Sequence, residues 1–210
     1  MTTRIFKIDR RNPDSEALNI AADVIRHGGL VAFPTETVYG LAANYRDQGA
    51  LERIYAVKGR PAGKPLTVQV ADKEALAEFI TDTTPAVKRL IDAFWPGPLT
   101  LVLRSKDGAK IGIRIPRNKI AQLLIKESGA PIVAPSANLS GEKPPKTAGE
   151  VAAYLGGKID IILDGGATDI GIESTVLDVT AVPFTILRQG AISKDAIKEA
   201  AKEEVRIKTI

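Results

Sequence analysis

The sequence predicts an α/β fold in a single domain over residues 1–210, built on a mixed β-sheet flanked by helices. Two observations predict this class. Helical and strand patterns alternate along the chain, which favours parallel strands joined by helical crossovers. Two late strand patterns, 174–179 and 184–188, are separated only by "TAVP", which favours an antiparallel pair. The 210 residues, 44% of them hydrophobic, suffice for one core, and no linker or repeat divides them.

Each element is expected from its hydrophobic pattern and from the capping, glycine or proline residues that bound it. The first helix begins at Asp14 or Ser15, because either side chain can cap it, and it ends at Gly28–Gly29. The strand at 30–33 is apolar and stops at Pro34. The other expected helices are 49–58, 72–80 with Asp72 as its cap, 85–94, 117–128, 146–155 and a charged amphipathic helix from Ser193 onward. The other expected strands are 66–71, 99–103, 111–116, 131–134, 158–166, 174–179 and 184–188.

Composition excludes several classes of protein. The absence of cysteine excludes disulfides, thiol catalysis and thiolate metal sites, and the lone His27 excludes clusters of metal-binding histidines, so no metal site is expected. His27 itself is expected to interact with a helix C-terminus. The N-terminus has no signal-peptide core and no apolar run approaches the length of a membrane span, which predicts a cytoplasmic protein without a membrane partner.

The net charge of the chain says little about its ligands, whereas the distribution of charge along the chain says more. The net charge of +4 is mild, but residues 104–119 hold six basic residues and only one acid. This local excess favours an anionic ligand, although a basic rim that binds nothing accounts for it equally well.

The stretch "KGRPAGKPL", residues 58–66, resembles a phosphate-binding P-loop but does not match it. Its two glycines are separated by three residues instead of four, and Lys64 precedes Pro65 where a P-loop has Ser or Thr. The stretch also follows a helix, whereas a P-loop precedes one. Lys58 and Arg60 are therefore expected either to be exposed cations at a helix end or, because two prolines stiffen the segment, to hold charge in a fixed place.

Polar segments follow or flank the apolar strands, where open α/β sheets bind ligands. They are "PTETVYGLAAN", "KGRPAGKPL", "APSANLSG", "DGGATDIGIEST" and "LRQG". No serine-hydrolase elbow, acidic metal cluster or dinucleotide motif accompanies them. Cations, hydroxyls and backbone amides remain, and these suit the binding of phosphate and carboxylate groups.

Arg114 is the residue of the 111–116 strand best suited to bind such a group. By strand alternation it lies opposite the isoleucines of that strand, and a guanidinium there can bind a carboxylate or phosphate with two bonds. A surface arginine is the alternative. Ser136 and Asn138 follow the strand at 131–134, where a plain turn is the alternative to a binding loop.

Taken together, the segments resemble the YrdC-like family of threonylcarbamoyl-AMP synthases, and the resemblance covers residues 5–192. The motifs that carry it are "FPTETVYGLAAN", "KGRP", "FWPGPLTLVL", "IGIRIP", "APSANLSG", "DGG…GIESTVLD" and "ILRQGAI". The resemblance implies a twisted, largely parallel sheet around a basic concave surface. It also implies a reaction in which L-threonine, bicarbonate and ATP give threonylcarbamoyl-adenylate and pyrophosphate. A separate tRNA threonylcarbamoyl transferase would use this product to modify tRNA.

Matched to this sequence, the family's motifs assign catalysis to Lys58 and Arg60. The expected ATP contacts are Lys58, Arg60, Lys64, Lys110, Ala134, Ser136, Asn138 and Arg188, and the expected threonine contacts are Thr37, Gln69, Arg114 and Ser174. Mg²⁺ is expected as the companion of ATP. Three of these positions depart from the family pattern, with Gln69 where longer members often have His, Lys64 where many have Asn, and Lys110 where Thr is common.

Two other functions are compatible with the sequence. A non-enzymatic domain that binds tRNA or double-stranded RNA is supported by the basic 104–119 stretch, but aromatic residues for base stacking are sparse at 5%. A carbamoyl-transferring relative of the kind that acts in hydrogenase maturation shares the expected fold. Such relatives are multidomain and contain cysteine, and this sequence has neither feature.

Overall fold

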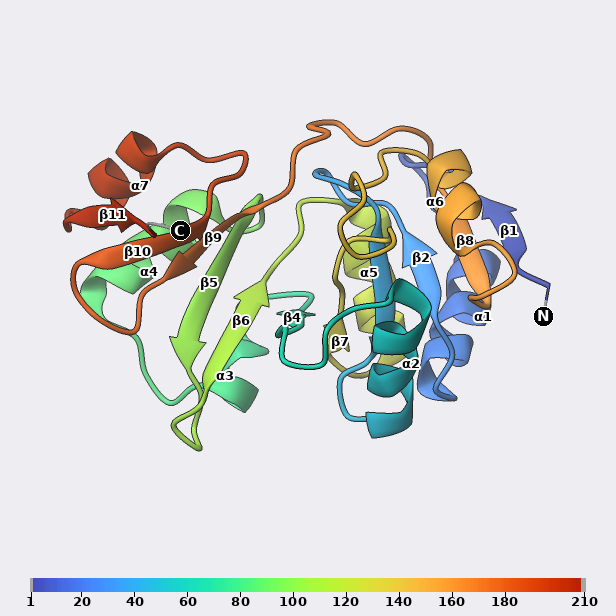
Figure 1. Cartoon of the computed structure of the whole chain (residues 1–210), viewed down its shortest axis with the longest axis horizontal. Coiled ribbons are helices and arrows are strands. Elements are labelled where there is room, and N and C mark those ends of the chain that lie inside the picture. Colours follow the sequence, from blue (N-terminus) through green and yellow to red (C-terminus); the bar gives the residue numbers. More distant parts are fainter. Residues whose placement is uncertain (1, 209–210) are drawn as a thin grey trace.

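The computed structural model describes residues 2–208 and contains one open, twisted sheet with helices on both faces (Figure 1). The strand order across the sheet is β1-β8-β2-β3-β7-β4-β6-β5-β9-β10-β11. The strands are β1 (Arg4–Lys7), β2 (Val31–Phe33), β3 (Gly40–Asn44), β4 (Thr67–Gln69), β5 (Leu99–Arg104), β6 (Lys110–Arg114), β7 (Ile132–Val133), β8 (Ile161–Asp164), β9 (Thr175–Asp178), β10 (Phe184–Arg188) and β11 (Val205–Ile207).

The sheet is evenly mixed, so the expectation of a mixed sheet is confirmed and the expectation of a largely parallel one is wrong. Within residues 2–208 the parallel pairs are β1–β8, β2–β8, β4–β6, β5–β9 and β10–β11. The antiparallel pairs are β2–β3, β3–β7, β4–β7, β5–β6 and β9–β10. The β9–β10 pair is the hairpin that the short "TAVP" connection predicts.

Most helices begin at a residue whose side chain accepts a hydrogen bond from the first turn, as expected for Asp14. Asp14, Asp47, Thr84, Asn118, Thr147 and Ser193 cap their helices in this way. The helices are α1 (Ser15–Arg26), α2 (Gln48–Lys58), α3 (Leu76–Phe79), α4 (Pro85–Phe94), α5 (Lys119–Ser128), α6 (Ala148–Leu155) and α7 (Lys194–Ala201). None of them is long and apolar enough to cross a membrane, within the described part of the chain.

The core has two clusters, one on each side of the β2–β3 region. Helices α1 and α5 cover one face and bury Val31, Phe33 and Leu163 there. The other cluster continues beneath α2, α4, α6 and α7 across the rest of the sheet. Helices α1 and α5 cover only the β1-to-β7 part of their face, and within residues 2–208 no helix covers that face of β4, β5 and β6. This uncovered part of the sheet is where polar side chains gather.

Four expectations from sequence need correction. The "GLAAN" part of an expected loop is strand β3, although glycine, alanine and asparagine seldom favour strands. Strand β1 lies near the N-terminus, where no element is expected from the sequence, and β11 lies in the tail that is expected to be helical from Ser193 onward. The expected helix 72–80 is only the four-residue α3, and Asp72 instead accepts a bond from Ala75 N in the turn before it.

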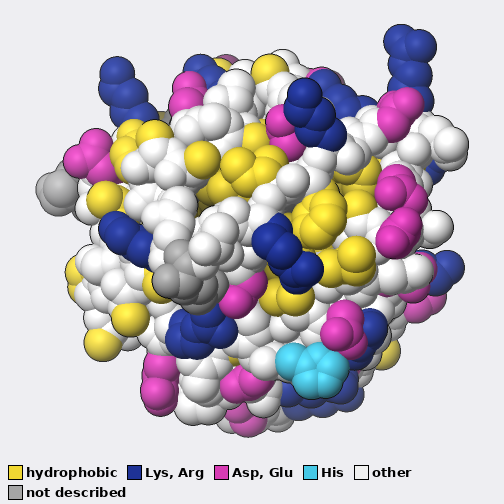
Figure 2. Space-filling view, turned by 90° about the vertical axis from the view of Figure 1, so that its right-hand side faces the viewer, with side chains coloured by type: hydrophobic (Ala, Val, Ile, Leu, Met, Phe, Trp, Pro, Cys, Tyr) yellow, Lys and Arg dark blue, Asp and Glu magenta, His cyan; other side chains and the backbone are white. Residues whose placement is uncertain are grey.

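Surface charge near the N-terminal strand is mixed. Figure 2 shows basic and acidic side chains interspersed on this face, with His27 exposed at the surface. His27 is the C-cap residue of α1, as expected, and its Nδ1 lies 2.9 Å from Asp23 O. The modest net charge of the chain is therefore not gathered into a basic patch on this side.

Candidate active site

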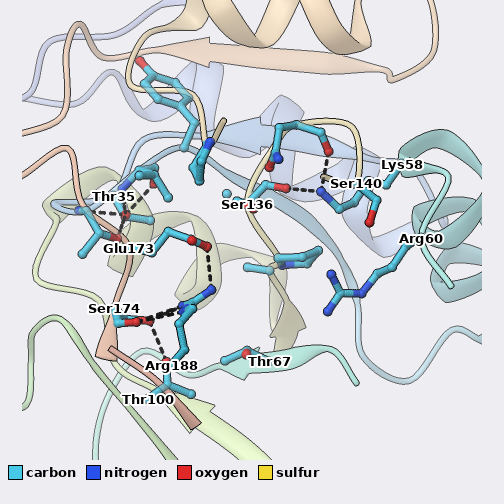
Figure 3. Close-up of a pocket in the computed structure, with 18 of the residues that line it drawn as sticks. Thr35, Lys58, Arg60, Thr67, Thr100, Ser136, Ser140, Glu173, Ser174 and Arg188 are labelled. Atoms are coloured by element: carbon cyan, nitrogen blue, oxygen red, sulfur yellow. Dashed lines mark hydrogen bonds and ion pairs between the residues drawn. The ribbon is translucent and has the colours of Figure 1, made fainter. Parts of the chain in front are cut away.

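A cavity of about 330 Å³ lies at the uncovered face of β4–β6. Its walls come from segments far apart in the sequence: the loop after β2, the end of α2, the loop after β7 and the ends of β9 and β10 (Figure 3). Of the twelve residues assigned by resemblance, eleven line it: Thr37, Lys58, Arg60, Lys64, Gln69, Arg114, Ala134, Ser136, Asn138, Ser174 and Arg188.

Lys58 is buried and holds two loops together. Its side chain is 2% exposed, and its Nζ donates hydrogen bonds to Ser136 O and Asn138 O in the loop after β7. Burial, helped by the neighbouring charges of Arg60 and Lys64, lowers the pKa of Lys58 to about 8. An exposed cation at a helix end, one of the two interpretations of the sequence, is therefore wrong for Lys58.

Arg60 is held by its own loop. Its Nη2 donates to Pro65 O at 2.6 Å and its Nε to Lys64 O at 3.3 Å, while Tyr55 Oη donates to Lys64 O at 3.0 Å. Gly59 makes this turn possible because it ends α2 with a left-handed φ of 56°. The braced loop presents the guanidinium toward the middle of the cavity (Figure 3).

Arg114 is buried beneath the cavity and not exposed at the surface. It is 5% exposed, and it lies 2.8 Å from the Glu36 carboxylate, which is 2% exposed. Its Nη2 also donates to Thr37 Oγ1 at 2.9 Å and its Nε to Gly97 O at 3.1 Å. None of these contacts uses Nη1, which leaves that arm of the guanidinium for a ligand. The geometry with Glu36 is that of an ion pair, because neither Glu36 oxygen has a hydrogen-bond partner within residues 2–208.

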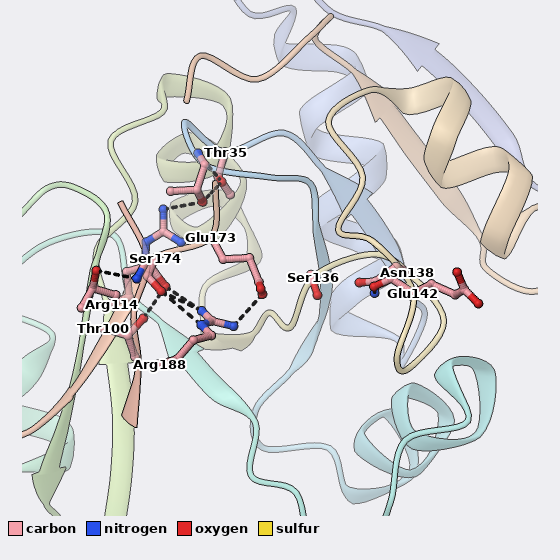
Figure 4. A network of polar contacts seen from close by, with 12 residues as sticks. Thr35, Thr100, Arg114, Ser136, Asn138, Glu142, Glu173, Ser174 and Arg188 are labelled. Atoms are coloured by element: carbon pink, nitrogen blue, oxygen red, sulfur yellow. Dashed lines mark hydrogen bonds and ion pairs between the residues drawn. The ribbon is translucent and has the colours of Figure 1, made fainter. Parts of the chain in front are cut away.

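The start of β9 and the end of β10 contribute a second arginine, Arg188, and the hydroxyl group of Ser174, which is held in a fixed orientation. Arg188 donates from Nε and Nη2 to Ser174 O, at 3.2 and 2.9 Å, and from Nη2 to Ser174 Oγ at 3.1 Å (Figure 4). Ser174 Oγ also lies 2.9 Å from Thr100 Oγ1. Arg188 Nη1 donates to the Glu173 carboxylate at 2.5 Å. Ser174 is therefore fixed between β5 and Arg188.

The loop after β7 supplies Ala134, Ser136 and Asn138. An isolated bridge between Gly40 and Ser136 ties this loop to the start of β3, and a Cβ at Gly40 would lie 3.1 Å from the Phe33 ring. Asn138 is buried, and its amide nitrogen donates to Leu139 O and Glu142 O, which fixes its orientation. The loop is therefore more than a plain turn, since the bridge to β3, a hydrogen bond from Ala134 N to Thr67 O in β4, and Lys58 hold it in place.

Lys110 is the exception among the twelve residues, and its assignment to this cavity needs correction. It begins β6, at the opposite end of the strand from Arg114, and its Nζ pairs with Asp178 at 2.7 Å. It lines a separate pocket together with Tyr55 and Phe79. Because four residues of extended strand span about 13 Å, Lys110 and Arg114 are too far apart for one small ligand group.

Sequence reasoning missed two acids that shape the site. Glu36 stands within the "PTETVYG" motif and Glu173 directly precedes Ser174, so both lie in segments that sequence alone marks. Their pairing with arginines far along the chain follows only from the fold. The lining residues that were not singled out include Thr35, Tyr39, Thr67, Thr100, Ser140, Glu142 and Pro144.

The charges of the lining indicate the chemistry that the cavity suits. Five cations and two carboxylates line it, together with hydroxyl groups of serine and threonine. In the described part of the chain, no three His, Cys, Asp or Glu side chains are grouped so that they could hold a metal ion. Anions that present several oxygen atoms, such as phosphates and carboxylates, fit this set of donors.

Comparison with known proteins places these features in a family. The sequence model of the Sua5/YciO/YrdC family, described as telomere recombination, matches residues 23–190. The chain is 45% identical over 195 residues to threonylcarbamoyl-AMP synthase of Pyrococcus abyssi, which covers 89% of this chain and 57% of that protein. It is 45% identical over 188 residues to the Bacillus subtilis protein of the same name, with 85% and 54% covered.

The fold agrees with a solved structure of the Pyrococcus abyssi protein, Sua5, in complex with L-threonine. The TM-score is 0.93 at 42% identity, over 98% of this chain and 63% of that one. This chain thus spans little more than half of the length of the curated relatives above. The match in sequence, extent and fold confirms the resemblance seen in the motifs, and the chain belongs to the Sua5/YciO/YrdC family.

Proposed function

We propose that this protein is a threonylcarbamoyl-AMP synthase, a nucleotidyltransferase that converts L-threonine, bicarbonate and ATP into threonylcarbamoyl-adenylate and pyrophosphate. The observation that carries the proposal is that two kinds of subsite open on one cavity. Arg114, Thr37 and Ser174 suit a carboxylate, and Lys58, Arg60 and Arg188 suit phosphates. The names of the Pyrococcus abyssi and Bacillus subtilis relatives support the same activity.

The chemistry needs positioning and charge more than a side-chain nucleophile. The amine of threonine and CO₂, in equilibrium with bicarbonate, form a carbamate with loss of a proton. A carbamate oxygen then attacks the α-phosphorus, and the bond to pyrophosphate breaks. Negative charge grows on the leaving pyrophosphate, so cations fixed around the phosphates lower the barrier. Lys58 and Arg60 are suited to this role because other groups already hold them in place.

Mg²⁺ enters this proposal as the companion of ATP. Mg²⁺ commonly takes only one or two protein ligands, so a carboxylate of the cavity lining would suffice to hold it, and the ion would supply positive charge to the phosphates. We also propose that the enzyme acts in the cytoplasm and hands its product to a tRNA threonylcarbamoyl transferase for threonylcarbamoyladenosine formation in tRNA. Binding of tRNA or double-stranded RNA is the alternative function, and RNA-binding measurements at several salt concentrations test it.

The direct test is pyrophosphate release from ATP with each substrate omitted in turn. We expect release to require both threonine and bicarbonate, and we expect ¹³C-labelled bicarbonate to appear in an adenylate detected by mass spectrometry. Release that is unaffected by the omission of threonine would contradict the proposal. Salt-sensitive RNA binding without any adenylate would favour the RNA-binding alternative.

Replacing Arg60 with alanine tests the phosphate subsite with little disturbance of the fold. We expect kcat to fall about 10²–10³-fold, since one electrostatic contact to developing charge is removed. Arg60 is half-buried and bonded only within its own loop, so stability should change by less than about 1 kcal/mol. Lys143→Ala, at an exposed cation outside the cavity lining, is the control. Equal kcat values for the two variants would show that Arg60 is an ordinary solvated surface residue without a role in turnover.

A further inference from the structure

Glu173 is a carboxylate placed among cations that the proposed function assigns to phosphates. Its carboxylate accepts from Arg188 and extends between the Ser174–Thr100 side of the cavity and the side that holds Ser136 (Figure 4). Burial lowers the pKa of Lys58, Arg60 and Arg188, and the Glu173 charge opposes this lowering in all three. One negative charge therefore acts on all three cations.

Glu173 is not needed to hold Arg188 in place. Arg188 already donates three hydrogen bonds to Ser174, two to its carbonyl oxygen and one to its hydroxyl. A carboxylate at this position repels an incoming triphosphate, and it offsets the attraction of the cations around it. Compensation of the neighbouring cations is one role for this carboxylate, and contact with a positively charged ligand is a second role.

Two ligands of the proposed reaction carry positive charge. The first is the ammonium group of threonine, but a carboxylate beside it would stabilise the protonated form, which has no lone pair with which to attack CO₂. The second is the divalent cation that accompanies ATP. Mg²⁺ prefers oxygen ligands, and it commonly takes one or two protein carboxylates while phosphate oxygens and water supply the rest. The Glu173 carboxylate, which is paired with the phosphate-site cation Arg188, fits the second ligand.

We infer that the Glu173 carboxylate directly contacts the divalent cation that enters with ATP, and that it releases Arg188 Nη1 to the phosphates when it does so. This inference rests on the proposed function. The Arg188–Glu173 pair is then the ligand-free arrangement of two groups that separate when the metal–nucleotide complex binds. Arg188 keeps its three bonds to Ser174 throughout, so only one arm of the guanidinium changes partner.

The test measures binding without turnover. ATP is titrated into the protein by calorimetry in the absence of threonine, once with Mg²⁺ and once with EDTA. Glu173→Gln removes the charge but keeps the shape and an acceptor for Arg188. We expect this variant to bind metal-free ATP more tightly than the original protein, and the ratio of the two affinities, with and without Mg²⁺, to fall at least about tenfold. Glu199→Gln, at an exposed carboxylate outside the cavity lining, should leave that ratio unchanged.

A second measurement distinguishes direct contact from action at a distance. With Mn²⁺ in place of Mg²⁺, water-proton relaxation reports how many exchangeable waters remain on the bound ion. Loss of a protein ligand in Glu173→Gln should add about one water. An unchanged affinity ratio or unchanged hydration overturns the inference, and so does a variant that loses threonine binding alone. Absence of ATP binding by the original protein would instead contradict the proposed function.

Discussion

Replacing Glu36 with alanine is expected to lower the free energy of unfolding by about 3–5 kcal/mol, the largest stability effect that the site predicts. Glu36 and Arg114 are 2% and 5% exposed and lie 2.8 Å apart, so each charge depends on the other for compensation in a medium of low dielectric constant. After the substitution Arg114 keeps Thr37 Oγ1 and Gly97 O as acceptors, but no negative charge remains beside it. Urea unfolding followed by circular dichroism measures the change.

Two further variants distinguish the effect of losing the Glu36 charge from the effect of losing its side-chain volume. Glu36→Gln fills the same volume and should be destabilised less than Glu36→Ala, because it leaves no cavity. A double variant, Glu36→Leu with Arg114→Met, removes both charges and should recover most of the lost stability, since a buried ion pair contributes little net stability compared with an apolar pair. The double variant should nevertheless lose threonine-dependent activity. A Glu36→Ala protein within about 1 kcal/mol of the original would show that Arg114 is solvated in solution.

The positions of most site residues could be predicted from sequence, because the residues that carry the chemistry stand in short motifs after strands. Lys58 ends α2 and Arg60 lies just beyond it, while Ser136 and Asn138 follow β7, so these residues stand at the ends of elements, where open α/β sheets bind ligands. Lys110 shows the limit of this reasoning. Lys110 is only four residues from Arg114 in the sequence, but the two residues stand at opposite ends of β6, and the sequence alone does not indicate which end lies at the cavity.

Other features depend on contacts between distant segments, and a single sequence does not contain them. Strand β3 forms because β2 and β7 pair with it on both sides, which overrides the weak strand preference of "GLAAN". The burial of Arg114 likewise depends on Glu36, 78 residues earlier in the chain, and alternation within β6 alone leaves a surface position equally plausible. Contacts between segments far apart in the sequence therefore determine both the formation of β3 and the burial of Arg114.

The affinity for ATP should fall as the pH rises through about 8, because Lys58 loses its proton there. Burial has lowered the pKa of Lys58 from an ordinary value near 10.5 to about 8, so the free enzyme loses this cation well before an exposed lysine would. Bound phosphates favour the charged form, which keeps the pKa higher in the complex. Between the two pKa values the dissociation constant should rise about tenfold for each pH unit, and below pH 8 it should be flat with respect to Lys58. Calorimetric titration of Mg²⁺–ATP from pH 7 to 9.5 measures it.

Two substitutions identify Lys58 as the source of this pH dependence. Lys58→Arg keeps its charge throughout the range, so its affinity for ATP should not change between pH 7 and 9.5. Lys58→Met should bind ATP weakly at every pH, and it should also lose about 1–3 kcal/mol of stability, because the Ser136 and Asn138 carbonyl groups lose their donor. Retention of the pH dependence in Lys58→Arg would assign the titration to another group. The same ammonium group thus secures the loop after β7 and supplies charge to the phosphates, so removal of Lys58 should affect stability and binding together, whereas removal of Arg60 should affect binding and turnover alone.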